Sequence, residues 1–101
     1  MKKLKLKISS EAYSDLEKIW VYPFKKWSKE QADKYYSAVI DEINFLRSNA
    51  YTGKSVNHIR LGYRVFFVKS HIIFYKIEEN QSLDIIRILH QSVNIEKWLK
   101  E

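Results

Sequence analysis

The 101-residue sequence contains no cysteine, only two glycines and a single proline. Without cysteine the chain can form neither a disulfide nor a thiolate metal site, and it has no thiol nucleophile. The isolated Gly53 and Gly62 cannot form a glycine-rich phosphate-binding loop. No apolar run reaches membrane-spanning length, and the lysine-rich N-terminus lacks the apolar core of a signal peptide. We therefore expect a cytoplasmic protein without a membrane partner.

The composition favours one compact domain over residues 1–101. Hydrophobic residues make up 46% of the chain, and no stretch is of low complexity. The formal net charge is +6. This charge favours an acidic partner, either nucleic acid or an acidic peptide, but it is also typical of a soluble lysine-rich surface.

The first third of the chain predicts a strand followed by a helix. Residues 2–8 alternate leucine or isoleucine with lysine, as expected of a strand with one buried face. Ser9 or Ser10 can then cap a helix. Its apolar positions recur at helical spacing: Ala12, Leu16, Ile19 and Trp20. Pro23 lacks an amide hydrogen, so we expect this helix to kink or stop near Tyr22.

A second and longer helix follows. Ser28 and Gln31 have the spacing of a capping box. The apolar stripe behind them consists of Ala32, Tyr35, Tyr36, Val39, Ile43 and Leu46. We expect this helix to end near Ser48 or Asn49, where polar residues and Gly53 indicate a loop.

The C-terminal half predicts three strands, at residues 62–68, 71–77 and 83–90. Hairpin-length turns separate them, so consecutive strands should be antiparallel. Their nearly continuous apolar character is typical of strands covered on both faces. Two helices can cover only one face, which predicts that the other is left for a partner. The fold class is α+β, in the order β-α-α-β-β-β, with a two-helix hairpin packed on one face of a small antiparallel sheet.

Two arginines and one histidine in these strands are the strongest functional candidates. Arg64 and Arg87 lie in apolar strands, where a guanidinium must find a carboxylate, solvent or a partner. The structural alternative is an ion pair with an acid such as Glu17, Asp41 or Glu42. His90 ends the last strand and is either a proton donor or acceptor or a local hydrogen-bonding group.

Other constellations are less informative. The three histidines, His58, His71 and His90, show no close metal-ligand spacing, so we expect neither a metal nor a cofactor. After the last strand, Asn94 can cap a final turn containing Ile95, Trp98 and Leu99. Trp98 in this tail is a candidate contact residue.

Five segments together carry a family resemblance. They are Ala12-x-x-Asp15-Leu16-x-x-Ile19-Trp20-x-Tyr22, Trp27-Ser28-x-x-Gln31-Ala32-x-x-Tyr35, Gly62-Tyr63-Arg64, Ser70-His71-Ile72-Ile73-Phe74-Tyr75 and Arg87-Ile88-Leu89-His90. In this order and spacing they resemble the ParE toxins of the RelE/ParE superfamily of bacterial type II toxin–antitoxin systems. The similarity spans about residues 9–99.

The resemblance implies a toxin, and one of two modes of action. The characterised members of the ParE branch poison DNA gyrase without catalysing a reaction, whereas the other branch cleaves mRNA on the ribosome. In the cleaving branch the middle strand often begins with Tyr-Arg, and that arginine can stabilise charge on the phosphate. The corresponding stretch here is His71-Ile72, which lacks the cation. The sequence therefore favours a gyrase inhibitor that is not an enzyme. The alternatives are a ribosome-dependent mRNA endonuclease using Arg64, Arg87 and His90, or a non-toxic interaction module.

The resemblance also implies two partners. The target would be DNA gyrase with its DNA, contacted through Arg64, Arg87, His90 and Trp98. An acidic, partly disordered antitoxin would neutralise the toxin in a hetero-oligomer. We expect the antitoxin to cover Phe66, Val68, Ile95 and Leu99.

Overall fold

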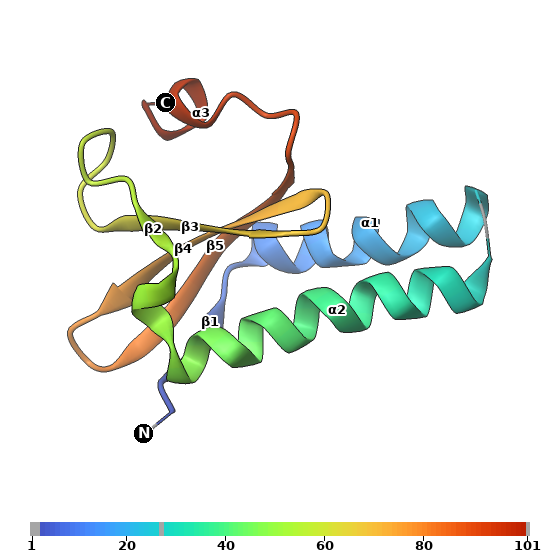
Figure 1. The fold of residues 1–101 in the computed structure, drawn as a ribbon, viewed down its shortest axis with the longest axis horizontal. Helices are drawn as coiled ribbons and strands as arrows, with labels where there is room; N and C mark the ends of the chain where they lie inside the picture. Colours follow the sequence, from blue (N-terminus) through green and yellow to red (C-terminus); the bar gives the residue numbers. More distant parts are fainter. Residues whose placement is uncertain (1–2, 27, 101) are drawn as a thin grey trace.

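The computed structural model describes residues 3–26 and 28–100, so Trp27 lies outside the described residues. The chain folds into a helical hairpin against a five-stranded sheet (Figure 1). The elements in order are β1 (Lys5–Ile8), α1 (Ser10–Lys26), α2 (Lys29–Ser48), the short 3-10 helix η1 (Ala50–Thr52), β2 (Lys54–Ser55), β3 (Tyr63–Val68), β4 (His71–Glu78), β5 (Ser82–His90) and α3 (Ile95–Lys100).

The sheet has the strand order β1-β5-β4-β3-β2. As predicted, β3, β4 and β5 form an antiparallel meander joined by short turns. β1 instead runs parallel to β5, which makes the sheet mixed rather than antiparallel throughout. The two-residue β2, which was not predicted, pairs only with Arg64 and Val65 at the opposite edge. The α+β class and the helical hairpin on one face are confirmed.

Serine caps begin both long helices, as the sequence indicates. Ser9 Oγ accepts the backbone N–H of Ala12 at 3.0 Å, and Ser28 Oγ accepts that of Gln31 at 3.1 Å. We expected α1 to kink or stop near Tyr22; the stop is wrong, because α1 continues through Pro23 to Lys26. Proline removes one hydrogen bond near the end of α1, and packing of α1 against α2 outweighs this local cost. None of the described helices is long and apolar enough to cross a membrane.

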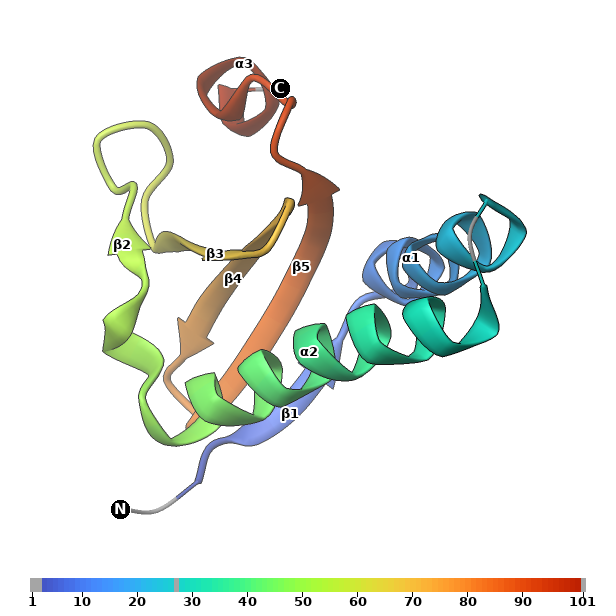
Figure 2. The same cartoon turned by 45° about the vertical axis from the view of Figure 1, so that its right-hand side comes forward.

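The sheet separates two apolar cores. On one face α1 and α2 pack over Val68, Ile73 and Tyr75, among others. On the other face α3 and the loop between β2 and β3 pack over Ile72 and Phe74 (Figure 2). The second face is therefore largely covered by the chain itself, which corrects the prediction that it is left for a partner. The sequence predicted a final turn containing Ile95, Trp98 and Leu99, but not that this turn packs on the sheet.

Tyr75 fixes the segment that leads into β2. Its buried hydroxyl donates to the carbonyl oxygen of Ala50 at 2.6 Å and accepts the N–H of Gly53 at 3.0 Å. A side chain at Gly53 would collide with the Tyr75 ring, so the chain requires glycine there. Burial raises the pKa of Tyr75. The hydroxyl therefore stays protonated and keeps its donor.

We expect Tyr75→Phe to lower the free energy of unfolding by about 1–3 kcal/mol, because a buried carbonyl and a buried N–H lose their partner. Urea unfolding followed by circular dichroism measures this. Tyr13→Phe is the matched control, since Tyr13 is exposed on α1 and should tolerate the change. Equal stabilities of the two variants would contradict the role of the hydroxyl.

Candidate functional site

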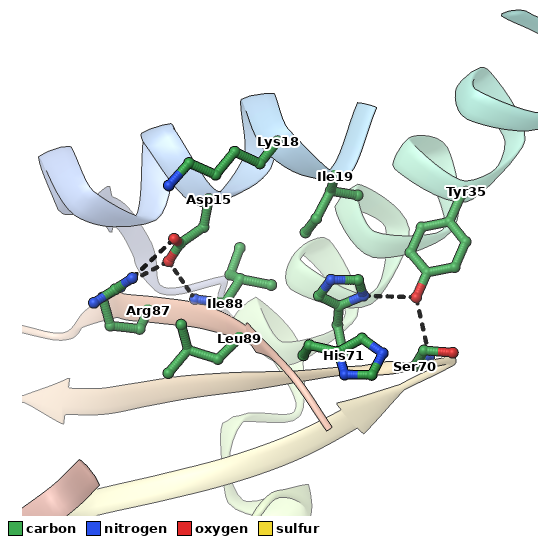
Figure 3. A pocket seen from close by; sticks show the side chains of 10 residues that line it. Asp15, Lys18, Ile19, Tyr35, Ser70, His71, Arg87, Ile88 and Leu89 are labelled. Carbon is green, nitrogen blue, oxygen red and sulfur yellow. Dashed lines mark hydrogen bonds and ion pairs between the residues drawn. The ribbon is translucent and has the colours of Figure 1, made fainter. Parts of the chain in front are cut away.

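A pocket of about 490 Å³ opens where the first half of α1 meets the beginning of β4 and the end of β5 (Figure 3). Its lining combines cations and titratable groups with apolar walls. The lining residues are Asp15, Lys18 and Ile19 of α1, Tyr35 of α2, Ser70 of the β3–β4 turn, His71 of β4, and Arg87, Ile88, Leu89 and His90 of β5.

A buried carboxylate holds one side of the pocket. Asp15 is only 6% exposed. Its Oδ2 accepts Nε of Arg87 at 2.8 Å and the backbone N–H of Ile88 at 2.9 Å, and its Oδ1 accepts Nη2 of Arg87 at 3.0 Å. The hydrogen bond to Asp15 raises the pKa of Arg87, so the guanidinium stays protonated. The structural alternative for Arg87 therefore applies, with Asp15 as the acid instead of Glu17, Asp41 or Glu42.

Tyr35 and His71 form the opposite side. The backbone N–H of Ser70 donates to Tyr35 Oη at 3.0 Å, and the same oxygen lies 2.6 Å from Nδ1 of His71. Since the tyrosine oxygen already accepts a hydrogen bond, its own proton can be donated to His71. Burial lowers the pKa of His71, and the neighbouring His90 lowers it further, against an opposing effect of Asp15. His71 is therefore neutral at pH 7.

His90 stands directly across the strand pair from His71, with the two ring centres 5.6 Å apart in an edge-to-face arrangement. Its Nδ1 accepts the backbone N–H of Ser92 at 3.1 Å, which leaves the proton of the neutral ring on Nε2. The side chain is exposed at the pocket rim. Each of the two imidazoles and the Tyr35 hydroxyl can form a hydrogen bond with a bound group, and Lys18 lines the same pocket with a positive charge.

The comparisons with known proteins identify the family. A family model described as the ParE toxin of the type II toxin–antitoxin system parDE matches residues 6–95. The chain belongs to the ParE toxin family. It is 30% identical over 92 residues to Toxin ParE1 of Mycobacterium tuberculosis, covering 91% of this chain and 94% of that relative. It is 34% identical over 88 residues to Toxin ParE1 of Caulobacter vibrioides, covering 87% and 90%.

Two solved structures share the fold of this ParE-family chain. The chromosomal ParDE system of P. aeruginosa matches with a TM-score of 0.75 and 19% identity, over 87% of this chain and 96% of that one. The toxin–antitoxin complex RelBE2 of Mycobacterium tuberculosis matches with a TM-score of 0.66 and 18% identity, over 88% and 99%. At these identities the likeness concerns the fold alone, which the two branches share.

The structure brings only two of the predicted target residues of this ParE-family chain together. Arg87 and His90 line the same pocket. Arg64 lies elsewhere, where its Nη1 donates to the carbonyl oxygens of Gly53 at 2.6 Å and Tyr51 at 3.4 Å. Trp98 packs on Phe74 on the opposite face of the sheet, with ring centres 4.7 Å apart.

The predicted antitoxin residues are also divided between the two faces. Phe66 and Val68 belong to the core under the helices, whereas Ile95 and Leu99 belong to the core under α3. Val68 and Leu99 are buried within the chain and present almost no surface to a partner. Phe66 is only partly buried and stacks on the exposed Phe45, with ring centres 6.1 Å apart.

Three pocket residues were missed as functional candidates: Asp15, Tyr35 and His71. The sequence pattern could have identified Asp15, because it lies on the same helical stripe as Ala12, Leu16 and Ile19. A carboxylate buried on such an apolar stripe needs a cation as its partner. Tyr35 and His71 carried no such signal in the sequence, because only the fold brings them together.

Among residues 3–26 and 28–100 no three histidine or acidic side chains could hold a metal ion.

Arg87→Ala should lower the free energy of unfolding by about 3 kcal/mol, because it leaves the Asp15 carboxylate buried without its cation. Lys100→Ala is the control, since it breaks an exposed pair with Glu96 and should change little. Chemical denaturation of both variants and of the Asp15→Ala/Arg87→Ala double variant measures the coupling. Additive losses, or equal losses for Arg87→Ala and Lys100→Ala, would contradict a buried pair.

The lowered pKa of His71 predicts that stability falls on acidification below its ordinary value of 6.5. Between that value and the depressed folded pKa the unfolded chain binds more protons, so stability rises with pH in this window. Thermal unfolding across the window should show a smaller slope for His71→Gln than for the wild type. His58→Gln is the control, and the hypothesis fails if it flattens the slope equally.

Proposed function

We propose that this chain is a toxin that acts by binding, holding DNA gyrase on cleaved DNA without catalysing a reaction. The ion pair between Asp15 and Arg87 carries this proposal. In the cleaving branch, as the resemblance implies, a strand arginine stabilises charge developing on the phosphate. Here Arg87 directs two of its donor groups to Asp15, and Arg64 does not line the pocket. The pocket arginine is therefore engaged first in stabilising the fold.

In this proposal, the toxin contacts gyrase through the rim of the pocket. His90 is exposed there and lies against His71, while Lys18 and the remaining donors of Arg87 flank the same opening. Such a mixture of apolar wall, cation and hydrogen-bond donor suits a protein surface with an acidic or carbonyl group. Arg64 and Trp98 lie away from this rim, so a target that reaches them must extend over the edge of the sheet.

Cleavage of mRNA on the ribosome is the second candidate. It is favoured by the arrangement of His71, His90 and Tyr35, whose titratable groups lie in contact around one opening. In that case one imidazole would take a proton from the attacking hydroxyl and another group would protonate the leaving oxygen. A non-toxic interaction module is the third possibility.

We further propose that an antitoxin segment neutralises the toxin along the outer edge of β3. β2 pairs only with Arg64 and Val65, so among the described residues no strand lies beside the rest of that edge. Phe67 is 55% exposed there, and the stack of Phe45 on Phe66 adjoins it. An extended segment with apolar anchors could pair with this edge and bury the phenylalanines. Acidic residues in it would suit the net charge of +6.

Induced expression in bacteria separates the candidates. A gyrase poison should trigger DNA-damage signalling and filamentation while protein synthesis continues. His90→Ala should reduce toxicity at unchanged thermal stability, whereas Gln91→Ala, an exposed neighbour outside the pocket, should remain as toxic as the wild type.

A damage reporter and pulse labelling of new protein, recorded over the same time course, distinguish the outcomes. Translation arrest that precedes any damage signal would assign the chain to the endonuclease class instead. Normal growth with soluble wild-type protein would favour the interaction module. In purified components, the wild type should increase gyrase-dependent DNA cleavage, and its failure to do so would refute the proposed target.

A further inference from the structure

The net positive charge of this chain arises from one segment, residues 43–77. Of the 18 lysines and arginines, six lie in residues 43–77, and none of the 12 acidic residues does. The remaining residues therefore balance, and the whole formal charge of +6 belongs to this stretch. A lysine-rich surface that served solubility alone would not need such segregation.

Four of the six cations gather at the edge of the sheet formed by β2 and the start of β3. The Arg60 guanidinium lies 4.8 Å from the centre of the Tyr63 ring, and the Lys76 ammonium lies 5.4 Å from the same ring. The Arg64 guanidinium lies 5.0 Å from the centre of the Tyr51 ring. Lys54 is paired opposite Val65 in the same edge.

Most of this charge is not neutralised within the chain. Lys76 lies 3.5 Å from Glu78, but in the described part of the chain no carboxylate pairs with Lys54, Arg60 or Arg64. Arg60 and Arg64 donate to backbone carbonyls, which fix their position and leave their charge available. The edge therefore presents held cations to an anionic partner.

An exposed apolar residue follows Arg60 directly in the sequence. Leu61 is 82% exposed, and Tyr51 is 75% exposed. The loop that carries Leu61 is held by a hydrogen bond, in which Asn57 Oδ1 accepts the N–H of Gly62 at 2.8 Å. Gly62 has a φ of 85°, a backbone conformation that favours glycine. Figures 1 and 2 both show this loop between β2 and β3 extending away from the helical hairpin. The exposed leucine is thus presented on an ordered tip.

We propose that this basic edge, defined by Lys54, Arg60, Leu61, Arg64 and Lys76, binds duplex DNA. The cations would contact phosphates, and Leu61 would press into a groove, where proteins commonly place apolar wedges between base steps. A protruding apolar tip suits the concave groove of a duplex. The choice of duplex DNA rests on the proposed function, because gyrase holds a DNA duplex beside any bound toxin.

Fluorescence anisotropy of a short labelled DNA duplex with the full chain, over a series of salt concentrations, tests the proposal. Lys54→Gln/Arg60→Gln should weaken binding and reduce the slope of log affinity against log salt by about 2, since each phosphate contact contributes roughly 0.9. Leu61→Ser should weaken binding severalfold at an unchanged slope. Lys5→Gln/Lys7→Gln on β1 removes the same charge from the opposite edge and should leave both quantities unchanged.

Several results would overturn the basic edge as a DNA site. These are no binding of the duplex at low salt, an equal loss in the β1 variant, full affinity of Leu61→Ser, or tighter binding of a single-stranded RNA of the same length. Loss of antitoxin binding by Lys54→Gln/Arg60→Gln with unchanged DNA binding would assign the edge to the acidic partner instead.

Two controls keep the test decisive. If Lys54→Gln/Arg60→Gln fails to fold, because Arg60 also bonds to the backbone of Leu99, the exposed Lys54→Gln alone should still reduce the slope by about 1. The duplex assay contains no gyrase. An absent gyrase effect with intact duplex binding therefore counts only against the proposed function, and the reverse result counts only against the basic edge.

Discussion

The hydrogen bonds that the buried carboxylate of Asp15 accepts from β5 are the interaction on which the rest of the molecule depends. β1 pairs with β5 only as far as Ile8 and Ile85, so the second half of β5 has no strand on that side in the described chain. The first turns of α1 take over this edge. Ser9 Oγ donates to the carbonyl oxygen of Ile86 at 2.7 Å, and Asp15 accepts the N–H of Ile88. A helix thus satisfies strand groups that a longer β1 would otherwise satisfy.

This arrangement explains why the pocket exists. A carboxylate buried to this degree is stable only when its oxygens are fully hydrogen-bonded, and Asp15 achieves this with two donors of Arg87 and one backbone N–H. The contact holds α1 over the end of β5 and keeps the space beside it open. His71 and His90, on neighbouring strands, then face that space together.

Local signals predicted much of the fold, and pairings distant in sequence account for the errors. The serine caps, α2 and the three-stranded meander followed from spacing, because each depends on nearby residues. The continuation of α1 past Pro23 depends on its packing against α2, which no local rule contains. The acid that pairs with Arg87 lies 72 positions away. Glu17, one of the acids considered, is exposed on another face of the same helix.

The pocket and the basic edge lie far enough apart to contact two different partners. Ser70, His71 and His90 lie where β3 turns into β4, whereas Tyr63 and Lys76 lie at the opposite end of that strand pair. Six extended residues span roughly 20 Å, so the two surfaces are separated by about that distance on one rigid sheet. A single toxin molecule could therefore contact a protein through the pocket rim and its DNA through the basic edge at the same time. Two weak contacts held at a fixed separation bind far more tightly than either alone. This would let a chain whose pocket arginine is paired with Asp15 act as a clamp on a complex of protein and DNA.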